Sequence, residues 1–218
     1  VPFFADIPKR TGFRGEYRYG LINDMRLLDK RRMPRMIDRF VTLAKRDDQL
    51  PTFSEYPKLT VDSERRGILV EALRLETTRP VVGLCPAAEF GDAKRWPKRH
   101  FATLAESLVD AGADVWIFGG NGDKGIAADI LEQVATSCHE HVVDLTGRTS
   151  LLDVVDIMGL CQCIVSNDSG LMHVASAIGC HAIVLYGSTS PGFTPPLTKQ
   201  VDIVSLSLEC SPCFKRTC

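Results

Sequence analysis

The sequence predicts a doubly wound α/β domain, in which helices cover both faces of a parallel sheet. Two observations carry this prediction. From residue 81 onward, short apolar runs alternate with segments of helical spacing, and the runs are apolar throughout rather than at every second position. Alternating strands and helices are typical of parallel sheets, and continuous apolar runs are typical of strands buried on both faces. Ligands bind such sheets at the carboxyl ends of the strands, so each loop after a strand is a candidate site.

The predicted helices and strands follow one another along the chain. Phe101 and Leu108 lie on one face of a helix predicted over residues 97–111, and Gly112 ends it. Similar spacing predicts further helices at residues 62–75, 126–135, 151–161 and 171–178. The apolar runs predict strands at residues 81–85, 115–118, 142–145, 163–166, 182–186 and 201–204.

Residues 1–58 lack this regular alternation. Their predicted elements are a strand at residues 10–13, a helix at residues 33–44 and a linker at residues 49–57. A segment of this length is too short to bury an independent core. We therefore predict that residues 1–58 are the C-terminal remnant of one domain with its linker, and that residues 59–218 form a second, nearly complete domain.

Composition and charge exclude several classes of protein. The 218 residues are 44% hydrophobic and 24% charged, which is ordinary globular usage and excludes a disordered, coiled-coil or collagen-like chain. Apolar stretches are far shorter than the ~20 residues of a membrane helix, and no signal peptide is visible. The net charge of −1 gives no basic excess, so we expect no nucleic-acid partner. The basic bias of residues 1–58, 13 Lys/Arg against 8 Asp/Glu, fits an acidic partner, a phosphate-rich substrate or a solvated helix face.

The eight cysteines show no disulfide framework, which favours a reduced, cytoplasmic protein. Five of them lie in or beside apolar runs or stand alone: Cys85, Cys138, Cys161, Cys163 and Cys180. The other three form a C-x2-C-x4-C pattern at Cys210, Cys213 and Cys218. Three thiols could begin a metal site, but a tetrahedral site needs a fourth ligand, so we predict no metal.

The loops after the first two strands contain groups suited to an anion and a ribose. In residues 86–97, Lys94 and Arg95 would supply positive charge to an anion, unless the loop is simply a solvated basic turn. Residues 119–125 contain G-x-G-x-x-G (Gly120, Gly122, Gly125), and Asp144 lies 19 residues beyond. This pattern superficially matches a dinucleotide fingerprint, although a complete βα unit precedes it. Asp123 in the same loop would stabilise a helix start or accept both hydroxyls of a ribose.

The loops after the third and fourth strands suit a base and a phosphate. Residues 144–150 end at Ser150, which forms a capping-box pattern with Asp153, and backbone groups of such a loop can read a base edge. The fourth loop runs Asp168-Ser169-Gly170 directly into a helix, whose N-terminal amides form a ready phosphate site. His173 lies one turn further, on the face of Ser169. The four loops together fit a nucleoside diphosphate conjugate.

Six motifs, spread over essentially the whole chain, are similar to those of a known protein family. They are VPFFADIP (residues 1–8), RTGFRGE (10–16), RYGLIND (18–24), CPAAEFGDAKRWP (85–97), SNDSGLMHVASA (166–177) and LYGSTSPGFTPP (185–196). By these motifs the chain resembles the ADP-heptose:lipopolysaccharide heptosyltransferases of glycosyltransferase family 9, of the heptosyltransferase II type. The resemblance implies the GT-B architecture, with an N-terminal acceptor domain and a C-terminal nucleotide-sugar domain.

The resemblance also implies roles for individual residues. Lys94 would bind the donor phosphates, Asp123 the ribose and the backbone near Thr149 the adenine. Asp168 would lie at the heptose and phosphate side, with Ser169, Gly170 and His173 around the diphosphate. Lys94 and Asp168 are thus the expected catalytic residues within these 218 residues.

The implied reaction moves L-glycero-D-manno-heptose from ADP-heptose to the inner-core heptose of lipopolysaccharide, with inversion and with neither metal nor cofactor. The implied partners are ADP-heptose and a lipid A–inner-core acceptor at the inner membrane of a Gram-negative bacterium, where peripheral membrane contact is expected. The family's base is an aspartate in the first loop of the N-terminal domain, and it has no counterpart here. We therefore expect a fragment that binds donor but does not transfer heptose by itself. The alternatives are another GT-B transferase with a different nucleotide sugar, and a nicotinamide-binding module.

Overall fold

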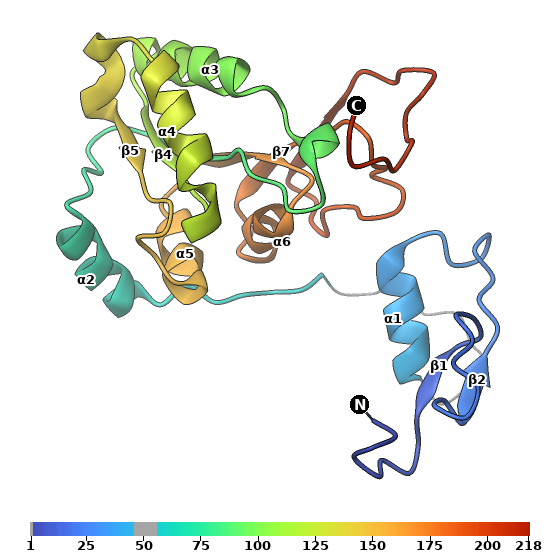
Figure 1. Cartoon of the computed structure of the whole chain (residues 1–218). Coiled ribbons are helices and arrows are strands. Elements are labelled where there is room, and N and C mark those ends of the chain that lie inside the picture. Colours follow the sequence, from blue (N-terminus) through green and yellow to red (C-terminus); the bar gives the residue numbers. More distant parts are fainter. Residues whose placement is uncertain (1, 46–55) are drawn as a thin grey trace. The chain divides into compact units, whose positions relative to one another are not determined.

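The computed structural model describes residues 2–45 and 56–218, which divide into two compact units. The first unit consists of Val1–Glu55 together with Gly192–Pro195, and the second of Tyr56–Pro191 with Pro196–Cys218. Each unit is described separately below (Figure 1). Most of the linker predicted at residues 49–57 lies outside the described residues.

The first unit contains a two-stranded parallel sheet and one helix. Strand β1 (Thr11–Phe13) pairs with β2 (Asp24–Arg26), and helix α1 spans Met36–Ala44. The Arg26 guanidinium donates to the Thr42 and Lys45 carbonyls, which ties β2 to the end of α1. The predicted helix start at residue 33 was wrong by three residues, because a residue before proline is disfavoured in the α conformation and Pro34 follows it.

The second unit is built on a six-stranded, fully parallel sheet. Its strands are β3 (Val81–Cys85), β4 (Asp114–Ile117), β5 (Val142–Asp144), β6 (Cys163–Asn167), β7 (His181–Tyr186) and β8 (Val201–Ser205). All six predicted strands are present, and each predicted end lies within one residue of the observed end. The order across the sheet is β5-β4-β3-β6-β7-β8. The order reverses between β3 and β6, and this topological switch point is where open α/β sheets bind ligands.

Helices cover both faces of this sheet (Figure 1). They are α2 (Ser63–Leu73), α3 (Lys98–Asp110), α4 (Lys124–Gln133), α5 (Leu151–Met158) and α6 (Gly170–Ala177), with short 3-10 turns η1 (Asp92–Lys94), η2 (Asn121–Asp123) and η3 (Thr136–His141). Alternate residues of β3 pack on opposite sides: Val82 faces the core of α3 and α4, and Val81 faces that of α2, α5 and α6. This two-sided burial confirms the fold predicted from the continuous apolar runs.

Two aspartates stabilise helix α2, one as its N-cap and one through Arg65. Asp62, the first residue of the helix predicted over residues 62–75, caps α2 by accepting from the Glu64 and Arg65 amides. Helix α5 ends at Met158, three residues before the predicted end, with Gly159 as its C-cap residue. The fully buried Asp156 of α5 accepts a hydrogen bond from Arg65, which fastens α2 to α5.

Candidate functional site

A large cavity opens at the carboxyl ends of β3, β4, β5 and β6, next to the switch point. It encloses about 650 Å³, within the ~300–1,000 Å³ range typical of small-molecule sites. Four of the predicted site residues line this cavity: Asp123, Thr149, Ser169 and Gly170. Asp123 follows β4, Thr149 follows β5, and Ser169 and Gly170 follow β6. Residues far apart in the sequence therefore meet at one place, as expected for loops at one sheet edge.

The ion pair between Lys94 and Asp168 lies beside this cavity. The Lys94 ammonium is 2.7 Å from Oδ2 of Asp168 and donates to the Asp168 carbonyl over 3.2 Å. The hydroxyl of Thr189 donates to the same Oδ2 over 2.6 Å. Asp168 is only 4% exposed, and a buried carboxylate needs such partners. Among the described residues, those that line the cavity do not include Lys94 or Asp168, but they include their sequence neighbours Arg95 and Ser169.

The start of α6 is open to a ligand. Ser169 is the N-cap residue in an extended conformation, but its hydroxyl makes no capping bond, and no acidic side chain lies in the first turn. A Cβ at Gly170 would meet no atom within 4 Å. First-turn amides without a side-chain cap favour an anion, both through free N–H groups and through the helix dipole.

His173 lies one turn into α6 and was predicted to stand beside the diphosphate. His173 is exposed, yet partial desolvation by the surrounding protein lowers the pKa of its imidazole below the ordinary 6.5. The Asp168 carboxylate opposes this shift, and the Lys94 ammonium adds to it. Desolvation therefore favours the neutral imidazole, which can form hydrogen bonds without adding charge to the site.

The cavity wall opposite α6 is formed by the loops after β4 and β5. Oδ2 of Asp123 accepts from the Gly120 amide over 2.8 Å, which closes the turn η2. The Oγ1 atom of Thr149 is buried and has no hydrogen-bond partner among the described residues. Such an orphaned hydroxyl at a cavity is a group that a ligand would satisfy. The predicted capping box is present, with Ser150 and Asp153 exchanging hydrogen bonds at the start of α5.

The glycine motif does not occupy the position of a dinucleotide fingerprint. It follows β4, whereas the fingerprint belongs after the strand at the switch point, which here is β3. Asp144, the acidic residue that follows the glycine motif by 19 residues, accepts from the Thr146 amide in a local turn. The topology therefore disfavours the nicotinamide alternative.

Two functional candidates were not singled out from the sequence. The side chain of Asn167 is fully buried, accepts from the Trp96 amide over 3.0 Å and donates to the Pro86 carbonyl over 2.7 Å. It thereby holds both ends of the loop that carries Lys94. Thr189, the partner of Asp168, comes from the loop after β7. Both lie in quoted motifs, but only the strand order shows what they contact.

Metal ligands, free thiols and helix lengths bear on the remaining sequence predictions. In the described part of the chain, no group of three or more His, Cys, Asp or Glu side chains could hold a metal ion. All eight cysteines are free thiols, and Cys210, Cys213 and Cys218 line a separate pocket of about 140 Å³. Within residues 2–45 and 56–218, no helix is both long and apolar enough to span a membrane.

The sheet order, the cavity at the switch point and the uncapped start of α6 define a doubly wound α/β domain with a candidate anion site at its switch point. The chain belongs to glycosyltransferase family 9 (heptosyltransferase), whose family model matches residues 1–218. The family resemblance seen in the motifs is thereby confirmed, as is the GT-B fold class, since the similar solved structures are GT-B heptosyltransferases.

Individual relatives agree. The chain is 43% identical to lipopolysaccharide heptosyltransferase 2 of Escherichia coli K12, covering 94% of this chain and 61% of that protein. It is 41% identical to lipooligosaccharide heptosyltransferase 2 of Haemophilus influenzae, covering 94% and 62%. The solved structure of E. coli ADP-heptose lps heptosyltransferase II matches with a TM-score of 0.86 at 43% identity, over 93% of this chain and 63% of that one. The chain thus spans about three fifths of the length of these relatives.

Proposed function

We propose that these residues form the donor side of a heptosyltransferase that binds ADP-heptose. In the whole protein, L-glycero-D-manno-heptose would pass to the inner-core heptose of lipopolysaccharide, with inversion and without a metal or cofactor. The observation that carries the proposal is the buried Lys94–Asp168 pair beside the open start of α6. The names of the relatives at 41–43% identity support the choice of donor and acceptor.

Each part of the donor would meet a matching group. The diphosphate would lie at the start of α6, where the Ser169 and Gly170 amides and the Lys94 ammonium offset its charge. The ribose would lie near Asp123, and the adenine near Thr149, whose buried hydroxyl has no partner among the described residues. Asp168 would hold Lys94 in place and face the heptose.

The chemistry follows from this placement. As the bond from the anomeric carbon to the diphosphate breaks, negative charge grows on the leaving phosphate, where a fixed ammonium and helix amides stabilise it. Inversion requires a single attack by the acceptor hydroxyl, whose proton passes to a general base. The proposal assigns no base among the described residues and places it on a segment outside these 218 residues. The lipid acceptor puts the reaction at the cytoplasmic face of the inner membrane, with the protein in peripheral contact.

Nucleotide binding tests the proposal on this chain. ADP at about one hundred times its Kd should stabilise the chain by ~2.7 kcal/mol, which raises Tm by roughly 5–11 °C. Lys94→Ala should lose most of this shift, whereas Lys199→Ala, an exposed lysine remote in sequence from the cavity loops, should keep it. UDP and GDP, tested in place of ADP, represent a transferase with a different nucleotide sugar, and NADH represents the nicotinamide-binding module. Stabilisation by UDP or NADH but not by ADP would reject the proposal.

Transfer itself is tested in a version extended to the full length of the relatives. Mass spectrometry of the acceptor should show one added heptose, and Lys94→Ala or Asp168→Ala should remove most of this product. The 218-residue chain alone should give none. Measurable turnover by the chain alone would show that the base has been misplaced.

A further inference from the structure

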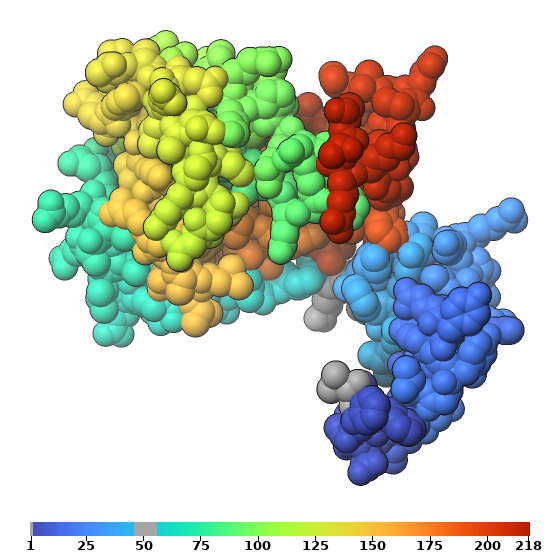
Figure 2. Space-filling view, in the orientation of Figure 1, coloured from blue at the N-terminus to red at the C-terminus, as the bar shows by residue number. Residues whose placement is uncertain are grey.

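The C-terminal segment, residues 210–218, packs against the loop that carries Lys94. The Ala93 amide, next to Lys94, donates to the Arg216 carbonyl over 3.1 Å. Further back, the Phe214 amide donates to the Ser188 carbonyl over 2.7 Å, and the Ser211 hydroxyl donates to the Gly187 carbonyl. In Figure 2 this segment, in red, contacts the green loop after β3, residues 86–97. The segment is therefore fastened both to the loop after β7 and to the loop after β3.

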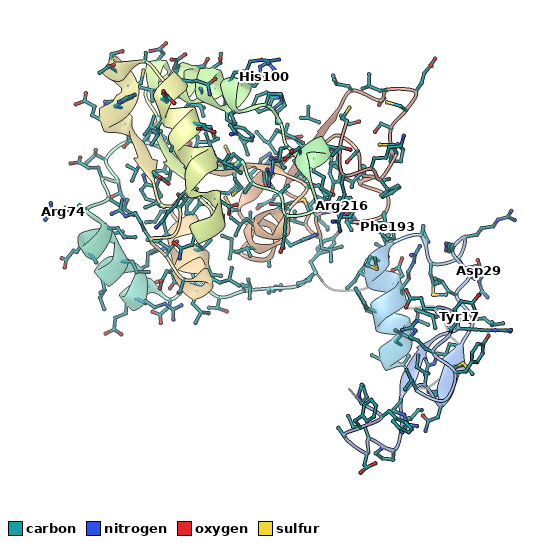
Figure 3. All side chains as sticks on the ribbon, in the orientation of Figure 1. Tyr17, Asp29, Arg74, His100, Phe193 and Arg216 are labelled. Carbon is teal, nitrogen blue, oxygen red and sulfur yellow. The ribbon has the colours of Figure 1, made fainter. Side chains whose placement is uncertain are left out.

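Phe90 connects the two cations of this contact. Its ring centroid lies 5.1 Å from the guanidinium carbon of Arg216 and 5.4 Å from the Lys94 ammonium. Both distances are within the ~6 Å reach of a cation–π interaction. Figure 3 labels Arg216 beside this loop. The ring thus has Arg216 as one partner and Lys94 as another.

Gly91 makes the close approach of the two backbones possible. A Cβ at this position would lie 2.5 Å from the Arg216 carbonyl oxygen and 2.9 Å from its Cα, and the φ of Gly91 is +148°. Only glycine tolerates both the conformation and the contact. The backbone of the C-terminal segment therefore contacts the backbone of the loop directly, without long flexible side chains between them.

We infer that Arg216 is a positioning residue for Lys94. Its carbonyl fixes the turn η1, and its guanidinium holds Phe90, against which the Lys94 side chain is ordered toward Asp168. A lysine loses considerable rotamer freedom when it is fixed, so a support that orders it before the ligand arrives strengthens binding of the phosphate. This inference rests on the proposed function, because it assumes that Lys94 meets the donor phosphates.

Calorimetric titration with ADP and with adenosine tests the inference. Arg216→Ala should weaken ADP binding about threefold to tenfold, the size expected for one cation–π contact and one ordered side chain, and leave adenosine binding unchanged. Phe90→Leu should have the same effect. Arg216→Lys, which keeps a cation above the ring, should restore part of the loss. Lys215→Ala, at the adjacent exposed cation, is the matched control and should bind ADP like wild type.

The double variant Lys94→Ala/Arg216→Ala separates positioning from direct contact. If Arg216 acts through Lys94, the second substitution adds no further loss to Lys94→Ala. Additive losses would mean that Arg216 meets the phosphate itself, and equal losses for adenosine and ADP would mean general loosening; either result overturns the inference. Unchanged ADP binding by Arg216→Ala rejects the inference alone, whereas a wild-type chain that binds no ADP rejects the proposed function as well.

Discussion

Replacing Asn167 by alanine should destabilise the second unit strongly. The Asn167 amide is fully buried and joins the two ends of the loop after β3, through the Pro86 carbonyl at 2.7 Å and the Trp96 amide at 3.0 Å. Alanine leaves both backbone groups without these partners. The loop between them carries Lys94, so the substitution should also weaken ADP binding.

The size of the effect follows from the two lost bonds. Each buried polar group left unsatisfied costs ~1–3 kcal/mol, so the pair costs about 2–6 kcal/mol. For a unit of this size, ~2–4 °C of Tm is lost per kcal/mol, which predicts a decrease of roughly 4–24 °C. A water molecule that enters the space would bring the loss toward the lower value.

Urea unfolding followed by tryptophan fluorescence measures this loss, because both tryptophans, Trp96 and Trp116, lie in the second unit. Gln133→Ala is the matched control, because Gln133 lies in the same unit. Its side-chain amide donates to the Asp129 carbonyl over 2.6 Å, but it is exposed, so water replaces this bond. A loss below ~1 kcal/mol for Asn167→Ala, no larger than a solvated bond, would refute the reasoning.

Two further predictions concern acid stability and thiol reactivity. Burial alone would raise the pKa of Asp156, but hydrogen bonds, chiefly the one from Arg65, hold this pKa below the ordinary 3.8. The ionised Asp156 carboxylate therefore stabilises the fold above pH 3.8, and this stabilisation is lost as the pH falls through the lowered pKa. Asp156→Asn should therefore flatten the acid limb of a stability-against-pH curve, and an unchanged limb would contradict the assigned pKa. Desolvation raises the pKa of Cys180 to about 11 and that of Cys85 still further, so both should resist iodoacetamide in the native state. Mass mapping should find rapid alkylation at the exposed thiols Cys210, Cys213 and Cys218; equal labelling of Cys85 would show that the core opens.

The fold could be predicted because its signal is local. Strands buried on both faces are apolar along most of their length. All of β3 and the central residues of β4 and β6 satisfy this, so the sheet was visible without knowledge of the strand order. Residues 24–26 gave no such signal, since β2 has only three residues, none of them fully buried. The predicted start of α1 was missed because Pro34 disfavours the helical conformation of the residue before it, which the apolar spacing does not reveal. The end of α5 at Met158 was missed because the apolar spacing continues past it to Cys161.

The partners of Asp168 show where prediction from the sequence ended. Thr189 is 21 residues from Asp168, and nothing in the sequence around either residue indicates that the two are in contact. Once β6 pairs with β7 in parallel, with Asn167 opposite Leu185, the loops that follow the two strands must start side by side. A buried carboxylate just past the end of β6 then finds its hydroxyl donor in the loop after β7 and its cation in the loop after β3, the neighbour on the other side. The chemistry of the site is therefore set by which strands are adjacent, and adjacency is decided by packing across the whole sheet rather than by any one motif.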